Sequence, residues 1–171
     1  MEHTKADIIF KDFWRNNERF ADLFNVVVFG GKEVIKPEAL HEMDTDVSGV
    51  IQLKDYKETL SRTRDVIKKT AYGVEFVVLG IESQQHIHYA MPLRVMGYDY
   101  ATYKKQYNNN ARQYKKQSAQ QDARLDEHEF LSKMKKTDRL LPVVTIVIYY
   151  GEKVWDAATS LTGILDMPAE M

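Results

Sequence analysis

Apolar residues recur at steps of three and four over residues 5–29, which is the spacing of one face of a helix. The residues that follow this spacing are Ile9, Phe10, Phe13, Phe20, Leu23, Phe24 and Val27. Asn16 and Asn17 interrupt the pattern, and Gly30 with Gly31 closes it in the manner of a helix C-cap. The pattern predicts a pair of amphipathic helices that covers a sheet.

Residues 64–70 and 75–82 have the composition of two β-strands joined by a short turn. Folded as a hairpin, these strands bring Asp65 and Glu82 together at one end of the sheet. Side chains alternate across a strand, so Gln84 projects to the same side as Glu82 if the strand continues through it. The hairpin is therefore the part of the chain where we expect chemistry.

Two carboxylates that meet beside an apolar strand form a divalent-metal site by default, because hard cations such as Mg²⁺ prefer oxygen ligands. Asp65 and Glu82 are the predicted ligands. Lys69 shares the strand face of Asp65, and Lys68 lies on the opposite face. A lysine beside such a site orients water or neutralises charge on a scissile phosphate. The alternative is that both lysines are ordinary surface charges.

Between the helix pair and the hairpin, the pattern is less regular. Pro37 predicts a turn or a short helix, residues 43–53 predict a bulged strand, and residues 54–62 predict a short exposed helix or an edge strand. Asp44 and Asp46 share a strand face and form an alternative pair of cation ligands. The other interpretation is that they are exposed turn residues.

A helix is predicted after the hairpin, with Pro92 in its first turn. Its second half contains five basic residues and no acid: Lys104, Lys105, Arg112, Lys115 and Lys116. Tyrosines 103, 107 and 114 interleave with them. Such a helix either follows a phosphate backbone or is a solvated face that leads into the polar loop at residues 118–129.

Residues 140–150 form the most strand-like segment, a nearly continuous run of Val and Ile. A strand with two apolar faces is expected to be buried on both, which predicts a central strand that runs parallel to a neighbour. With the hairpin and the helix before it, this strand completes a ββαβ order.

An Asp, a spacer and Glu-x-Gln at the end of an apolar strand resemble the core of the PD-(D/E)XK nucleases. More narrowly, the chain resembles the recombination-promoting nuclease/putative transposase (Rpn) family. The segments that carry this resemblance are FADLFNVVVFGG, RDVIKK, VVLGIESQ, IHYAMPLRVMGYDY and LLPVVTIVIYYGEKVW, in that order. The resemblance implies an α/β fold with a restriction-endonuclease-like core, in which helices flank a mixed central sheet. It also implies one domain over residues 1–171, with its core at about 5–155 and a C-terminal helical region that is cut short.

The activity implied by the resemblance is metal-dependent cleavage of DNA by an endonuclease, associated with recombination or transposition. Asp65 and Glu82 would hold Mg²⁺ or Mn²⁺, while Gln84 stands where the superfamily usually has a catalytic lysine. The positive charge lost there would come from the metal, from Lys68 or from Lys69. Many nucleases of this superfamily act as dimers, so a homodimer is also an expectation. The alternative is a catalytically weak or inactive module that binds nucleic acid or protein.

Asp7 has two interpretations. With Thr4 three positions before it, Asp7 predicts an N-terminal helix cap. The resemblance implies an acidic group near this point, preceded by a histidine, but Ala6 takes the histidine position here.

The composition excludes several classes of function. The 171 residues include no cysteine, which excludes disulfides, thiol catalysis and thiolate zinc sites. The net charge of −1 provides no whole-chain basic field, so contact with DNA must come from a local patch. No run of apolar residues approaches the length of a membrane span or a leader peptide, which predicts a cytoplasmic protein without a membrane partner.

Overall fold

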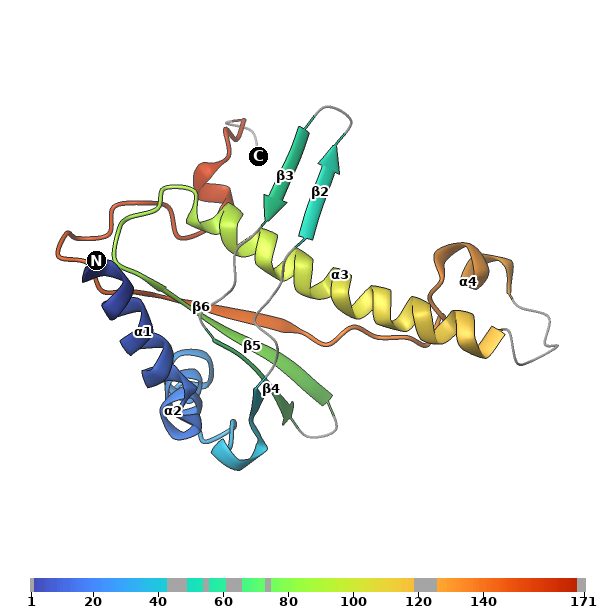
Figure 1. The fold of residues 1–171 in the computed structure, drawn as a ribbon, viewed down its shortest axis with the longest axis horizontal. Helices are drawn as coiled ribbons and strands as arrows, with labels where there is room; N and C mark the ends of the chain where they lie inside the picture. The colour runs from blue at the N-terminus through green and yellow to red at the C-terminus, as the bar shows by residue number, and fades with distance from the viewer. Residues whose placement is uncertain are drawn as a thin grey trace.

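A mixed four-stranded sheet separates two layers of helices, with α1 and α2 on one side and α3 on the other (Figure 1). The structure is a computed structural model, and it describes residues 2–42, 49–53, 56–60, 66–72, 75–118 and 126–168. The helices are α1 (Glu2–Arg15), α2 (Asn17–Phe29), α3 (Met91–Ser118) and α4 (Glu127–Ser132), with short 3₁₀ turns η1 (Pro37–Ala39) and η2 (Leu161–Ile164). The strands are β1 (His41–Glu42), β2 (Gly49–Leu53), β3 (Tyr56–Leu60), β4 (Val66–Tyr72), β5 (Glu75–Gln84) and β6 (Val143–Tyr149).

The predicted hairpin is confirmed as β4 and β5, which pair antiparallel from Val66 opposite Ile81 to Tyr72 opposite Glu75. The predicted parallel partner is also confirmed, because β6 runs alongside β5 with Val78 opposite Val143 and Gln84 opposite Tyr149. A parallel pair needs a long crossover connection, and α3 lies within it. The sheet order is β1-β4-β5-β6, so β5 pairs with strands on both sides.

One expectation about β6 is wrong. Its apolar run predicts a central strand, but among the described strands β6 lies at the edge of the sheet, next to β5 alone. All seven of its residues are half-buried. The run is apolar because helices cover both faces of the strand, and covering both faces does not require a second neighbour in the sheet.

The core on the α1–α2 side is built around the aromatic rings of α2. Phe20 and Phe24 are fully buried and stack with their centroids 4.9 Å apart. Alternate β6 residues pack against this cluster from the sheet: Val144, Ile146 and Ile148. The intervening residues of β6 face α3, where the Thr145 hydroxyl donates a hydrogen bond of 2.8 Å to Asp99 Oδ1.

The predicted break between the first two helices is confirmed at Asn16, whose side chain caps α2 by accepting from Arg19 N. Gly30 closes α2 with a φ of 61°, the left-handed conformation that favours glycine. The predicted cap at Thr4 is wrong, because α1 already begins at Glu2.

Between α2 and β4, the structure describes part of the irregular stretch. Residues at Pro37 form η1, as predicted for a short turn, and β2 and β3 pair antiparallel as a separate two-stranded sheet. For residues 54–62, the strand alternative holds over Tyr56–Leu60. Asp44 and Asp46 lie outside the described residues.

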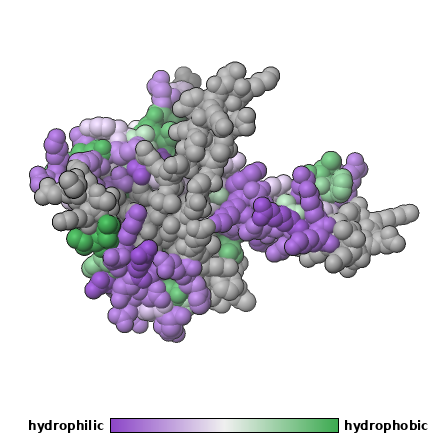
Figure 2. All heavy atoms as spheres, in the orientation of Figure 1, coloured by the Kyte–Doolittle hydropathy of each residue, from purple (hydrophilic) through white to green (hydrophobic). Residues whose placement is uncertain are grey.

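Helix α3 extends beyond the sheet, and its outer half carries α4 beside it (Figure 1). The Tyr107 hydroxyl donates a hydrogen bond of 2.7 Å to Ser132 O, which ties α3 to the end of α4. Hydrophilic residues cover much of the visible surface of this outer half (Figure 2). No helix in the described part of the chain has both the length and the apolar character that a membrane span requires.

Lys68 is the most unusual member of the interior. Only 1% of its surface is exposed, and its ammonium group donates to Arg15 O at 2.6 Å and to Asn17 Oδ1 at 2.7 Å. Nζ also lies 4.8 Å from the centroid of the Phe20 ring. Because Arg15 is the last residue of α1, the cation stabilises the negative end of that helix.

Burial of Lys68 should give unfolding a measurable pH dependence. Desolvation lowers the pKa of Lys68 from 10.5, and Glu42 opposes part of that shift. At pH values between the lowered pKa and 10.5, the unfolded chain binds more protons at Lys68 than the folded chain does. The contribution of Lys68 to the free energy of unfolding therefore rises with pH in this window. The free energy of unfolding of wild type, relative to Lys68→Met, should therefore increase as the pH is raised through this window.

Urea unfolding at a series of pH values measures this difference. Lys115→Met removes a lysine from an exposed position and is the control for loss of one charge. A wild-type minus Lys68→Met difference that does not change with pH would contradict the buried, desolvated position of Lys68.

Candidate functional site

The candidate site lies at the end of β5, on the side of the sheet that faces α3. Gln84 ends this strand, and its backbone carbonyl accepts a hydrogen bond of 3.0 Å from Tyr150 N. Its position is opposite Tyr149 of β6, and that of Glu82 is opposite Val147. Residues two apart on a strand belong to the same face, so positions 82 and 84 belong to the α3 face together with Tyr149 and Val147.

Of the two predicted carboxylate residues, the structure describes the backbone of Glu82 but not Asp65, which lies outside the described residues. Asp65 is joined to Val66, and Glu82 is joined to Ile81, and these two neighbours pair across the hairpin. Within the described ranges, no three His, Cys, Asp or Glu side chains gather as a ready-made metal site.

The two adjacent lysines of β4 belong to opposite faces of the sheet, because successive residues of a strand alternate between its faces. Lys69 is placed by its backbone opposite Val78, on the face to which positions 82 and 84 belong. Lys68 faces α1 and α2 and is 1% exposed, so the prediction that this residue is a surface charge is wrong. Its charge is bound inside the α1–α2 layer, on the other side of the sheet from Gln84.

Arg94 is the residue near Gln84 that sequence reasoning missed. Its Nη1 lies 3.5 Å from Gln84 Oε1, and its Nε donates a hydrogen bond of 2.9 Å to the Tyr98 hydroxyl. The guanidinium carbon is 5.6 Å from the centroid of the Tyr98 ring, which is itself only 4% exposed. The available signal was the spacing of Arg94 and Tyr98 at i and i+4, directly after the predicted start of the helix at Pro92.

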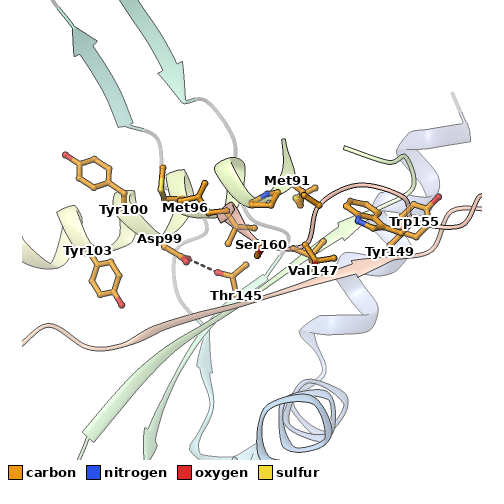
Figure 3. A pocket seen from close by; sticks show the side chains of 15 residues that line it. Met91, Met96, Asp99, Tyr100, Tyr103, Thr145, Val147, Tyr149, Trp155 and Ser160 are labelled. Atoms are coloured by element: carbon orange, nitrogen blue, oxygen red, sulfur yellow. Dashed lines mark hydrogen bonds between the residues drawn. The ribbon is translucent and has the colours of Figure 1, made fainter. Parts of the chain in front are cut away.

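A cavity of about 900 Å³ lies beside this end of the sheet (Figure 3). It is lined mainly by apolar and aromatic side chains from α3, β6 and the segment after β6, among them Met91, Met96, Tyr100, Val147, Tyr149 and Trp155. Asp99 and Thr145 are polar members of the lining, and they bond to each other. Because Val147 and Tyr149 pair with Glu82 and Gln84, the cavity adjoins the face to which those positions belong.

The turn after β6 closes tightly onto the end of β5. Tyr149 packs edge-on against Trp155 with ring centroids 5.1 Å apart, and its hydroxyl donates to Lys153 O at 2.7 Å. At Gly151, a Cβ atom would overlap Gln85 O and the Tyr149 hydroxyl. Glycine is therefore required for this turn to lie against the residue that follows Gln84.

The five basic residues predicted on α3 are all exposed: Lys104, Lys105, Arg112, Lys115 and Lys116. The interleaved tyrosines make contacts within the fold. The Tyr103 hydroxyl accepts from Val143 N at 3.1 Å, Tyr107 bonds to Ser132 O, and Tyr114 is 5% exposed. The basic residues thus form a surface of charge on the outer half of α3, where Tyr103 and Tyr107 are half-buried and Tyr114 is buried.

Comparison of the chain with protein-family models, with curated proteins and with solved structures found no match. The resemblance of the motifs to the Rpn nucleases therefore stays a prediction from the sequence, and the geometry around Gln84 has to be tested directly.

Gly151→Ala should destabilise the joint between β5 and β6. The methyl group would overlap a backbone carbonyl, which cannot move as freely as a side chain, so we expect a loss of about 1–3 kcal/mol in the free energy of unfolding. Gly97→Ala is the matched control, because a Cβ there meets nothing within 4 Å and lies in a helix. Chemical denaturation of the two variants measures the difference; equal stability of both would contradict the close approach at Gly151.

Proposed function

We propose that this chain is a metal-dependent endonuclease that hydrolyses phosphodiester bonds in DNA, in the context of recombination or transposition. The observation that supports the proposal most directly is the β4–β5 register. It pairs Val66 with Ile81, the residues to which Asp65 and Glu82 are joined. Gln84 follows on the same strand, beside a cavity and an arginine.

Asp65 and Glu82 are the proposed ligands of Mg²⁺ or Mn²⁺, because carboxylate oxygens are the donors that these cations prefer. A divalent cation bound there would polarise the phosphate and lower the pKa of a water molecule. The amide of Gln84 is suited to position water or a phosphate oxygen by hydrogen bonding, but it carries no charge. Lys69, on the same face of β4, is a proposed source of positive charge.

The proposed reaction is a hydrolysis that uses water alone as co-reactant. The water oxygen forms a bond to phosphorus, and the bond from phosphorus to one ester oxygen breaks. One proton leaves the attacking water for solvent, and the departing oxygen takes up one proton. The products are a phosphomonoester end and a hydroxyl end, with no change of oxidation state.

The exposed basic residues of α3 are the proposed contacts to the phosphate backbone. Lys105, Arg112 and Lys116 are separated by seven and four residues, which places them within about 40° of one another around a helix of 3.6 residues per turn. They therefore follow one side of α3, as phosphate contacts along a groove would require. Each phosphate neutralised by such a residue releases a counterion and adds affinity that falls with salt. A cysteine-free enzyme that acts on DNA suits the cytoplasm, and we propose that location.

A non-catalytic binding module is the second candidate. It is favoured by the uncharged Gln84 and by the net charge of −1, because a slow or absent reaction needs neither a catalytic lysine nor a strong field. In that case the basic surface of α3 would still bind nucleic acid, and DNA would remain intact.

Glu82→Gln and Asp65→Ala should each abolish Mn²⁺-dependent nicking of plasmid DNA while the protein stays folded, because each removes a proposed ligand. Calorimetric titration with Mn²⁺ should lose its binding signal in both variants. Glu152→Gln, at an exposed position after β6, is the control for loss of one carboxylate.

Undiminished nicking in either variant would remove the proposed metal site. Wild-type protein that binds DNA in a salt-sensitive way, but neither binds Mn²⁺ nor nicks the plasmid, would support the binding module instead.

Replacing both Arg112 and Lys116 with Gln should weaken DNA binding and reduce its dependence on salt. If both residues bind phosphates, the slope of log affinity against log salt on duplex DNA falls by about 0.9 for each phosphate that the variant no longer neutralises. Fluorescence anisotropy in EDTA, at several salt concentrations, measures the slope without cleavage. Replacing Lys32 and Lys36 with Gln removes the same charge from exposed positions after α2. Equal slopes for the two double variants would indicate that DNA binds to a surface other than that of Arg112 and Lys116.

A further inference from the structure

We infer that Arg94 is a phosphate-binding cation at the end of β5, and that it provides positive charge at the place of Gln84, in addition to the charge proposed for Lys69. This inference rests on the proposed function for its catalytic part. Its structural basis is the position of the Arg94 guanidinium, 3.5 Å from the Gln84 amide oxygen at Nη1.

The need for a cation here follows from the chemistry. When water attacks a phosphodiester, negative charge builds up on the non-bridging oxygens, and groups aimed at that charge accelerate the reaction. Gln84 can donate a hydrogen bond there but contributes no charge. Lys68 is on the other side of the sheet, where its ammonium group is bound to Arg15 O and Asn17 Oδ1.

The position of Arg94 is fixed from two directions. Along α3, its Nε donates to the hydroxyl of Tyr98, which is buried at 4% exposure and therefore a rigid support. Across to the sheet, its Nη1 reaches Gln84 at the end of β5. A guanidinium held in this way is oriented before any substrate arrives, which is the condition for electrostatic stabilisation without reorganisation.

Arginine also suits the task by its own chemistry. The guanidinium keeps its charge at every pH that a protein tolerates, and its planar array of N–H donors matches two oxygens of a phosphate. Arg94 exchanges no proton in the reaction. It binds the phosphate oxygens while the water oxygen bonds to phosphorus and the departing ester oxygen takes a proton from solvent.

The competing interpretation is that Arg94 only holds α3 against β5. The two roles differ in which substitutions they tolerate. A residue that only clamps α3 against β5 depends on the length and planarity of the arginine side chain. A phosphate ligand depends on positive charge near the end of β5. A lysine placed at residue 84 should therefore replace the charge lost at residue 94 if Arg94 binds phosphate, and should not restore function if Arg94 is a clamp.

The test compares wild type with Arg94→Met, Arg94→Lys, Gln84→Lys and the double variant Arg94→Met/Gln84→Lys. Arg94→Met should lower the rate of Mn²⁺-dependent cleavage by about 100-fold, as expected for loss of one charge-stabilising donor, with Mn²⁺ binding unchanged. The double variant should recover at least about one tenth of wild-type activity, and Arg94→Lys should fall between wild type and Arg94→Met.

A second measurement needs neither metal nor cleavage. Binding of a duplex oligonucleotide in EDTA should lose about 0.9 from its salt slope in Arg94→Met, and keep the wild-type slope in Arg94→Lys. Arg19→Met is the matched control, because Arg19 also lies over an aromatic ring, 4.3 Å from the centroid of Phe13, but on the α2 side of the sheet. It should change neither the rate nor the slope beyond the effect of one remote charge.

The inference is overturned if Arg94→Met cleaves DNA as fast as Arg19→Met. It is also overturned if neither Arg94→Lys nor Gln84→Lys in the double variant recovers activity lost in Arg94→Met, since a clamp that needs the length and planarity of arginine behaves in that way. If wild type cleaves no DNA, the proposed function fails, and the EDTA slopes then decide phosphate binding alone: a lower slope in Arg94→Met supports it, and an unchanged slope rejects it.

Discussion

The pairing of β5 with both of its neighbours is the constraint on which the rest of the molecule depends. Antiparallel pairing with β4 and parallel pairing with β6 fix which residues of the three strands belong to each face. A slip of one residue in either pairing would turn every side chain of that strand to the opposite face. The buried contacts of Lys68 and of Val144, Ile146 and Ile148 resist such a slip, because they fit only one register.

This register separates two kinds of chemistry. On the α1–α2 side, aromatic packing surrounds one lysine whose charge is used to hold a helix end. On the α3 side, Arg94 reaches Gln84 at the end of β5, and Asp99 accepts a hydrogen bond from Thr145 within β6. The two adjacent lysines of β4 thus belong to different environments, although nothing in the pair Lys68–Lys69 itself shows which is which.

Local pattern was sufficient to predict most elements of the fold. The helix pair, its break at Asn16, the β4–β5 hairpin and the parallel strand β6 all follow from periodicity, capping residues and β-branched composition. Periodicity does not count the neighbours of a strand, so the edge position of β6 was missed. It also treats a lysine as a surface residue, whereas the buried place of Lys68 depends on acceptors more than fifty positions away.

The candidate site was predictable only in part, for the same reason. Gln84 and Glu82 could be assigned to one face because two residues of one strand suffice for that inference. The contact of Arg94 with Gln84 depends on how α3 lies across the sheet, which no local pattern specifies. The hydrogen bond of the Tyr107 hydroxyl to Ser132 O likewise joins residues 25 positions apart, which no local pattern specifies.

Helix α3 joins the two regions proposed to contact DNA, since Arg94 lies in its first turn and Lys116 in its last. At 1.5 Å per residue, an uninterrupted helix separates these two residues by about 33 Å. At 3.4 Å per step, that is the length of about ten base pairs of duplex. A duplex that lies along the helix must therefore be about ten base pairs long to touch both ends. Shorter fragments, including small products of the proposed cleavage, would be released more readily.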